Sequence, residues 1–336
     1  DRILGVGSLD ELMRWGDHCV DDTFRDHVLT PGFVEAHSHV MSGGTWEHVY
    51  VGFFDRRDPT GRIWPGCKSI DEVVARLREA DAAMTDPDQI MICWGLDPIY
   101  LTGERLVGRH LEAVSERRQI FILHASGHLA TVNSAVIRHD NITADNPTPG
   151  IQLDEYGQPN GELQEPAAMS LASGQRMLRE GYASELAKWN YAYEARNAGH
   201  TLVTDLGTSS VDEQGVANWS AVTSHPDYPT RVMVAGSVFA TALPPEDIAR
   251  RVVQLRDNPP NDKLRFGIIK LIIDGSIQGF TARLTWPYYF NPPAGNAENG
   301  LWLMPPDQVP DIVEIFHRAG LTVHCHCNGD QAAEVF

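Results

Sequence analysis

Apolar runs and amphipathic segments alternate along the second half of the chain. The apolar runs are short and bounded by glycine, proline or charged residues, which predicts buried strands. The strands predicted in this way are 201–207, 231–238, 266–274 and 321–326. The amphipathic segments predict helices over 185–198, 244–255 and 307–320. Strands and helices that alternate in this order are typical of a parallel α/β fold.

An earlier apolar run, 28–34, leads into the sequence Glu35-Ala36-His37-Ser38-His39. We interpret this run as a buried strand, which brings the predicted parallel sheet to five strands. Because side chains alternate along a strand, His37 and His39 point to the same face and can bind one ion. Neutral imidazole is a favoured ligand of Zn²⁺ and similar cations. The same pattern also fits two histidines that are hydrogen-bonded within a core or loop.

The interval from about residue 42 to 180 does not follow this alternation. It is rich in Trp, Gly, Pro and charged residues, and it predicts a helix near 70–83 and strands at 89–94 and 119–124. We therefore expect a large insertion after the first strand. The division expected for the chain is 1–27, 28–41 with strand 1, 42–182 as an inserted subdomain, and 183–336 with the following β/α units.

Composition narrows the classes of function. With 336 residues and 42% hydrophobic content, the chain can bury one large core. Its 45 acidic and 27 basic residues give a formal charge of −18, which opposes nucleic acid or an anionic membrane surface as a partner. No apolar run approaches the roughly 18 residues of a membrane span, and the first residues have no signal-peptide architecture. Five cysteines without disulfide spacing suit a reducing compartment, so we expect a cytoplasmic protein.

A second group of candidate ligands is the sequence His324-Cys325-His326-Cys327. A structural zinc knuckle is not expected here, because such sites use CxxC-type loops and alternate residues of a strand face opposite sides. A catalytic-metal ligand fits better, since catalytic groups gather at the carboxyl ends of parallel strands. His326 lies nearest that end and is the better candidate. His324 would face the same side one layer deeper.

Lys270 interrupts a strand that is otherwise almost wholly apolar. Its ammonium would be desolvated there, at a cost of several kcal/mol unless it is paired or neutral. One interpretation is a salt bridge to Asp274, Asp205 or another inward carboxylate. The other is an amine neutral enough to react with CO₂, so that the carbamate bridges two metal ions.

Four segments together resemble the amidohydrolase superfamily, and three of them its family 3. The first-strand segment resembles the superfamily's opening signature, and the other three resemble, in order, the family's Ser-Gly-His…Asn-Ser, Lys…Asp-Gly-Ser…Thr-Ala and His-x-x-Gly-Asp blocks. The four segments are Thr30–His39, Ser126-Gly127-His128 with Asn133-Ser134, Lys270 with Asp274-Gly275-Ser276 and Thr281-Ala282, and His326-Cys327-Asn328-Gly329-Asp330. Glu35 stands where the family usually has Asp.

The resemblance implies a TIM-type (β/α) barrel of the metal-dependent hydrolase kind, incomplete here at about five strands, with 1–27 as the remnant of an N-terminal β-sandwich. It implies one or two divalent ions, Zn²⁺ first among them, and a substrate contact from His128. The implied metal ligands are His37, His39, carbamylated Lys270 as the bridge, and His326. The family's general-base aspartate follows strand eight, beyond Phe336, so no catalytic base is assigned.

These features imply a metal-dependent amidohydrolase of the EC 3.5 type that cleaves C–N bonds of small N-acyl or N-formyl amides. The alternative is a catalytically inactive fragment or a metal-binding scaffold, and homo-oligomerisation stays open. Aromatic residues either line an apolar substrate pocket or pack in the core and loops. They are Trp46, Trp64, Trp94, Tyr100 and the aromatic residues of 286–290.

Overall fold

The computed structural model describes residues 3–207, 210–240, 243–285, 289 and 299–336, which form two compact units, Asp1–Gly32 and Phe33–Phe336. In the first unit, the described residues form helix α1 (Leu9–Leu12) and a 3₁₀ turn at Met13–Trp15, and no strand. The side chain of Ser8 caps α1 and is met by Glu11. The assignment of residues 1–27 as the remnant of a β-sandwich remains a prediction. A short helix is stabilised by local hydrogen bonds, whereas a strand needs the backbone of a partner.

Five parallel strands form the first sheet of the Phe33–Phe336 unit, in the order β1-β10-β11-β12-β13. This result confirms the predicted parallel α/β order. Their bounds are β1 Phe33–Ser38, β10 His200–Asp205, β11 Arg231–Ser237, β12 Leu264–Ile272 and β13 Thr322–His326.

The first strand begins later than predicted, at Phe33 rather than at Val28. Pro31 lacks a backbone N–H, and the first sheet hydrogen bond runs from Phe33 N to Gly199 O at 2.9 Å. The expectation that residues 28–34 form a buried strand is also wrong, because Val28 and Val34 are exposed. An apolar run shows where a strand may pair but not whether another element covers it.

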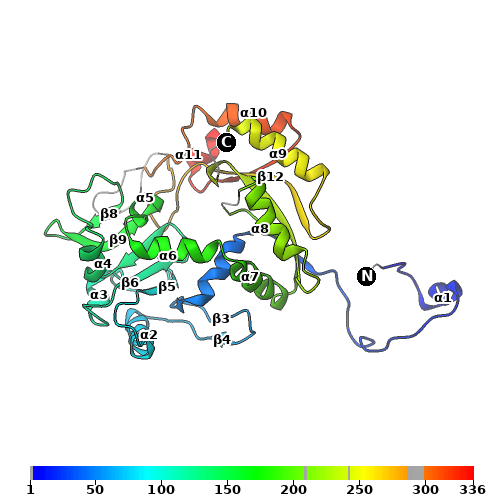
Figure 1. The fold of residues 1–336 in the computed structure, drawn as a ribbon, viewed down its shortest axis with the longest axis horizontal. Helices are drawn as coiled ribbons and strands as arrows, with labels where there is room; N and C mark the ends of the chain where they lie inside the picture. Colours follow the sequence, from blue (N-terminus) through cyan, green and yellow to red (C-terminus); the bar gives the residue numbers. More distant parts are fainter. Residues whose placement is uncertain (1–2, 208–209, 241–242, 286–288, 290–298) are drawn as a thin grey trace. The chain divides into compact units, whose positions relative to one another are not determined.

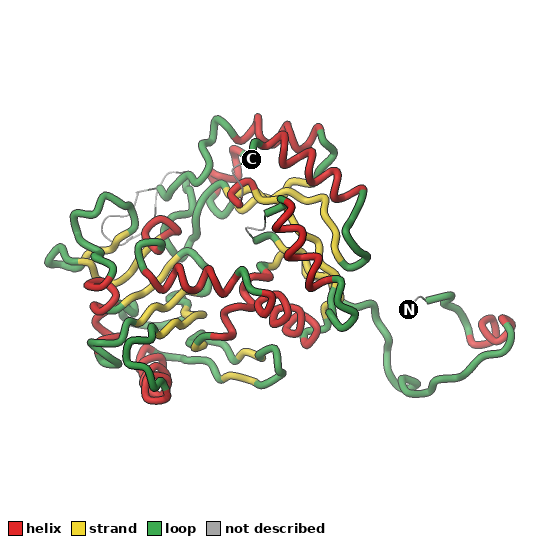
Figure 2. Tube along the Cα trace, viewed as in Figure 1, coloured by secondary structure: helices red, strands yellow, loops and turns green. Residues whose placement is uncertain are grey.

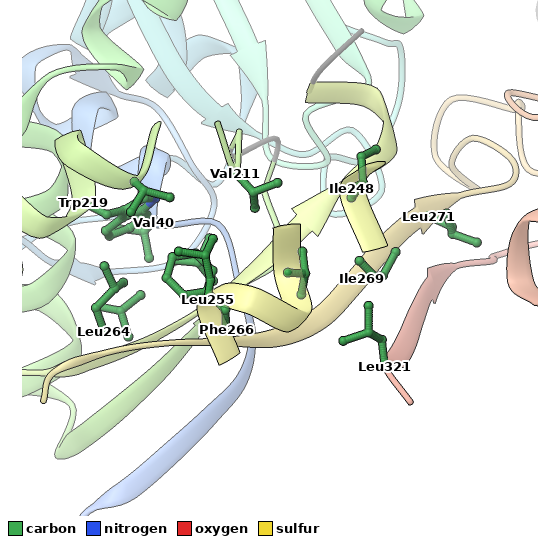
Figure 3. Packing of buried hydrophobic residues seen from close by; sticks show 14 of the residues in the cluster. Val40, Val211, Trp219, Ile248, Leu255, Leu264, Phe266, Ile269, Leu271 and Leu321 are labelled. Atoms are coloured by element: carbon green, nitrogen blue, oxygen red, sulfur yellow. The ribbon is translucent and has the colours of Figure 1, made fainter. Parts of the chain in front are cut away.

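Helices pack against this parallel sheet and close its main core (Figure 2). Figure 3 shows Trp219 of α8 and Leu255 of α9 gathered with Leu264 and Phe266 of β12. Side-chain caps begin two of these helices, Ser184 for α7 and Asp212 for α8. The helix bounds are α7 Glu185–Asn197, α8 Glu213–Thr223, α9 Pro245–Asp257, α10 Val309–Arg318 and α11 Asp330–Val335.

A second sheet of six strands comes from the sequence between β1 and β10, in the order β2-β5-β6-β7-β9-β8. Both faces of its central strands are buried, as Phe121 and Leu123 of β6 join one apolar cluster and Ile120 and Ile122 join another. That this region is an insertion into the barrel remains a proposal. The strands are β2 Val49–Tyr50, β5 Met91–Leu96, β6 Ile120–His124, β7 Leu129–Val132, β8 Ile151–Leu153 and β9 Pro159–Gln164.

Helices and a small hairpin surround the second sheet (Figure 1). Helix α2 spans Ile70–Ala83, as the sequence predicts. The others are α3 Gly108–Glu112, α4 Ser134–His139, α5 Glu165–Met169 and α6 Ser173–Tyr182, with the hairpin β3 Arg56–Arg57 and β4 Ile63–Trp64 and a 3₁₀ segment Val40–Glu47. Among the helices that the structure describes, none is both long and apolar enough to cross a membrane.

Candidate metal centre

Histidines from both end strands of the parallel sheet meet at its carboxyl edge. The ring of His37 at the end of β1 lies 5.4 Å from that of His39 and 4.9 Å from that of His324 on β13, between centroids. The β12–β13 register places Lys270 beside His324 and Ile272 beside His326. The structure thus brings His37, His39 and His324 together across the strands, next to the lysine.

Polar contacts hold the end of β1 in this position. The carboxylate of Glu35 accepts a hydrogen bond from the backbone N–H of His37 at 3.0 Å. The Ser38 hydroxyl donates to the carbonyl of Thr204 at 2.9 Å, and Asp205 accepts from the N–H of Val40 at 2.9 Å. Glu35 therefore orients the backbone of the histidine segment, a role consistent with a neighbour of the ligands.

His37, His39, His324 and His326 are neutral at pH 7 because each has a lowered pKa. Burial and the positive charge of Lys270 lower the pKa of His37 and of His39 to about 4. Burial, followed by Lys270, also lowers the pKa of His324, and burial lowers the pKa of His326. Neutral imidazoles retain a free nitrogen lone pair, which is what a metal ion requires.

The amine of Lys270 is buried and has no hydrogen-bond partner among the residues that the structure describes. The residue is 2% exposed, and its Nζ makes no hydrogen bond within the part of the chain that the structure describes. Burial lowers the pKa of this amine, against a smaller opposing effect of Cys325. An amine with a lowered pKa is neutral more often, and a neutral amine is a nucleophile.

Asp274 does not serve as the salt-bridge partner considered for Lys270. Its fully buried carboxylate accepts hydrogen bonds from the backbone N–H groups of Arg283 at 2.8 Å, Asn328 at 2.9 Å and Gly329 at 2.7 Å. Asp274 thus ties the segment after β12 to the turn after β13. This role fixes the backbone that follows His326.

His326 and His128 lie side by side, with ring centroids 5.3 Å apart. The Nε2 atom of His326 is 2.9 Å from the carbonyl oxygen of Gly275 and 3.0 Å from Nδ2 of Asn328. His128 follows β6 in the second sheet region, so the structure does place it against a barrel-strand histidine. Both histidines are partly buried.

Glu165 was missed by the sequence analysis. Its carboxylate lies 2.8 Å from Nδ1 of His128 and also accepts a hydrogen bond from the Thr281 hydroxyl. Thr281 lies 116 residues away along the chain. A lone glutamate before a proline carries no sequence signal for such a contact, because its partners come from two distant segments.

The donor chemistry at this edge fits a divalent metal ion, since it combines several neutral imidazoles with an amine that could become a carbamate. As the side chains stand, no three His, Cys, Asp or Glu residues among those described are grouped closely enough to hold one ion. Lysine is not among these residue types, but after reaction with CO₂ its carbamate would offer oxygen ligands like those of a carboxylate. The ligand set His37, His39, Lys270 and His326 therefore remains a prediction.

Some of the aromatic residues singled out from the sequence line a cavity, whereas others pack against neighbouring rings. Trp46 and Trp64 line a cavity of about 160 Å³, together with Tyr50. Trp94 packs against Trp46 with ring centroids 5.0 Å apart, and Tyr100 stacks on Phe53 at 5.2 Å. Of the segment 286–290, residues 286–288 and 290 lie outside the described residues.

Comparison with known proteins identifies the family of the chain. The model of a family described as the amidohydrolase family matches residues 25–336. The chain is 25% identical to protein LONG AFTER FAR-RED 3 of Arabidopsis thaliana over 99% of its length and 55% of that relative. It is 25% identical to exoenzymes regulatory protein AepA of Pectobacterium carotovorum, over 91% of this chain and 63% of the relative. The putative amidohydrolase YtcJ of Bacillus subtilis is 21% identical, over 99% and 59%. The chain thus spans somewhat more than half the length of these relatives.

Two solved structures share the fold. An uncharacterised metal-dependent hydrolase from Pyrococcus horikoshii superposes with a TM-score of 0.53 at 21% identity, over 91% of this chain and 55% of that one. A second, from Pyrococcus furiosus, gives 0.51 at 21% identity, over 91% and 56%. The five-stranded parallel sheet is therefore consistent with an amidohydrolase-type barrel.

Proposed function

Because the chain belongs to the amidohydrolase family, we propose that it carries the metal-binding half of a hydrolase that cleaves C–N bonds of small N-acyl or N-formyl amides. The observation that carries this proposal is the buried amine of Lys270, which has no partner in the described part of the chain and lies beside a group of histidines with lowered pKa. Leaving a cation desolvated costs several kcal/mol, so a role in chemistry explains the residue better than a role in stability.

We assign His37, His39 and His326 as metal ligands, Lys270 as the bridging ligand after carbamylation, and His128 as a substrate contact. The neutral Nζ of Lys270 would attack CO₂, form an N–C bond and release one proton, which leaves a carbamate anion. A bound Zn²⁺ ion would supply a Lewis acid and a water of lowered pKa. Asp274 and Glu35 hold the backbone on which these ligands stand.

The test follows carbamate formation and metal content in the purified chain. With Zn²⁺ and ¹³C-bicarbonate, we expect a carbamate signal in the ¹³C NMR spectrum and bound zinc by elemental analysis. Lys270→Met should abolish the signal. Lys188→Met is the matched control, since Lys188 is also buried but its amine contacts the carbonyls of Ala183 and Ser184.

A carbamate signal that persists in Lys270→Met would refute the assignment of Lys270. Release of amine from N-formyl and N-acyl amides, dependent on zinc, would establish the reaction class. Zinc binding with a carbamate but without turnover would instead favour the metal-binding scaffold.

A further inference from the structure

Glu165 is the first residue of α5 and makes all its polar contacts at one junction. Its side chain is 6% exposed, with one carboxylate oxygen on Nδ1 of His128 and the other on the hydroxyl of Thr281. Its backbone N–H also donates to the carbonyl of His128 at 2.7 Å. The residue thus clamps His128 at both backbone and ring.

The backbone at this junction is strained. Glu165 has φ +63°, in the left-handed region that suits glycine better than a branched or charged residue. Among the described residues, only two other non-glycine residues have positive φ, and one of them, Phe280 at +59°, precedes Thr281. The hydrogen bond between Glu165 and Thr281 thus has a strained residue on each side. Such strain indicates that the Glu165 side chain has a functional role.

The contact between Glu165 and Thr281 also leaves no room for a side chain at Gly275. A Cβ atom on Gly275 would lie 2.8 Å from the Glu165 carboxylate and 2.3 Å from the Thr281 hydroxyl. The carbonyl of the same glycine contacts Nε2 of His326. Glu165 therefore links His128 to the segment that orients a candidate metal ligand.

The hydrogen bond decides which ring nitrogen of His128 carries the proton. An ionised carboxylate can only accept, so Nδ1 must donate. In the neutral ring, Nε2 is then an acceptor. A ring fixed in this way beside His326 would accept a hydrogen bond from a donor in the site.

We propose that Glu165 is a positioning residue that holds His128 as its Nδ1–H tautomer, so that Nε2 accepts the N–H of an amide substrate. The choice of substrate rests on the proposed function, whereas the tautomer does not. Esters and N,N-disubstituted amides lack this donor and would be bound less well.

The tautomer is tested by ¹⁵N NMR of the imidazole side chains in the metal-free chain, with His128 assigned by His128→Asn. We expect a protonated Nδ1 and an unprotonated Nε2. Glu165→Gln should keep this pattern, because the amide oxygen still accepts. Glu165→Gly relaxes the left-handed backbone and should fold, but it should lose the Nδ1–H tautomer. Glu162→Gln is the control, since this buried carboxylate binds Arg105 instead.

A wild-type spectrum with protonated Nε2, or the same tautomer in Glu165→Gly, would overturn the proposal. In the active enzyme, Glu165→Gly should reduce the preference for a secondary over a tertiary amide, in kcat/KM, by about tenfold, the worth of one hydrogen bond. An unchanged preference would likewise overturn it. Absence of zinc and carbamate with the tautomer intact would instead refute only the proposed function.

Discussion

The two sheets of the Phe33–Phe336 unit differ in whether a buried basic side chain has polar partners. Near the second sheet, Arg118 is 7% exposed and forms an ion pair with Asp81 and hydrogen bonds of 2.7 Å to the carbonyls of Asp86 and Gln89. In the parallel sheet, the more deeply buried Lys270 has no such partner within the described chain. A buried charge that serves stability is offset by partners, so an unpartnered amine marks the sheet that carries chemistry.

The largest effect is expected from Arg118→Met. The substitution leaves the carboxylate of Asp81 and two carbonyls without their donor, which should lower the free energy of unfolding by about 3–5 kcal/mol. Urea denaturation followed by circular dichroism measures the change. Arg117→Met is the control, because the neighbouring Arg117 pairs with Asp88 at an exposed site and should lose less than about 1 kcal/mol. If both variants lost the same free energy of unfolding, the partners of buried Arg118 would not be what stabilises it.

Lys270→Met should have the opposite sign. It removes a desolvated amine that has no partner to lose, so the metal-free protein should become more stable by about 1–4 kcal/mol at pH 7. The pKa of Lys270 is lowered in the fold, so the unfolded chain holds the proton more tightly. The gain should therefore shrink as the pH rises toward the ordinary pKa of 10.5. Destabilisation as large as that of Arg118→Met would show that the amine is paired after all.

The last effect depends on pH and concerns a buried histidine of the second sheet. Burial lowers the pKa of His124 in β6 from 6.5 to about 3, so between these values the unfolded chain binds a proton that the folded chain does not. Stability should fall with decreasing pH across this window, by up to about 1.4 kcal/mol per pH unit. In His124→Phe the slope of unfolding free energy against pH should flatten. Loss of the hydrogen bond between His124 and Thr131 changes the unfolding free energy at every pH but not its slope against pH. An unchanged slope would exclude His124 as its source.

Local pattern was enough for most elements of the fold. The helix expected at 70–83 is α2, Ile70–Ala83, because a capped amphipathic helix is specified by its own residues. The parallel order of the barrel strands also followed from alternating apolar and amphipathic runs. The start of β1 did not, since burial of residues 28–34 depends on what covers them.

For the candidate site too, the sequence identified some residues and only the structure identified others. The sequence alone singled out His37, His39, Lys270 and His326, because a polar residue within or at the end of an apolar strand is visible in one dimension. Only the tertiary structure showed that Glu165 binds His128, and that Lys270 has no hydrogen-bond partner among the described residues. The partners of a buried charge come from distant segments, as when Asp205 binds the backbone of Val40, 165 residues away, and their approach is set by sheet register and packing. No local pattern encodes that geometry.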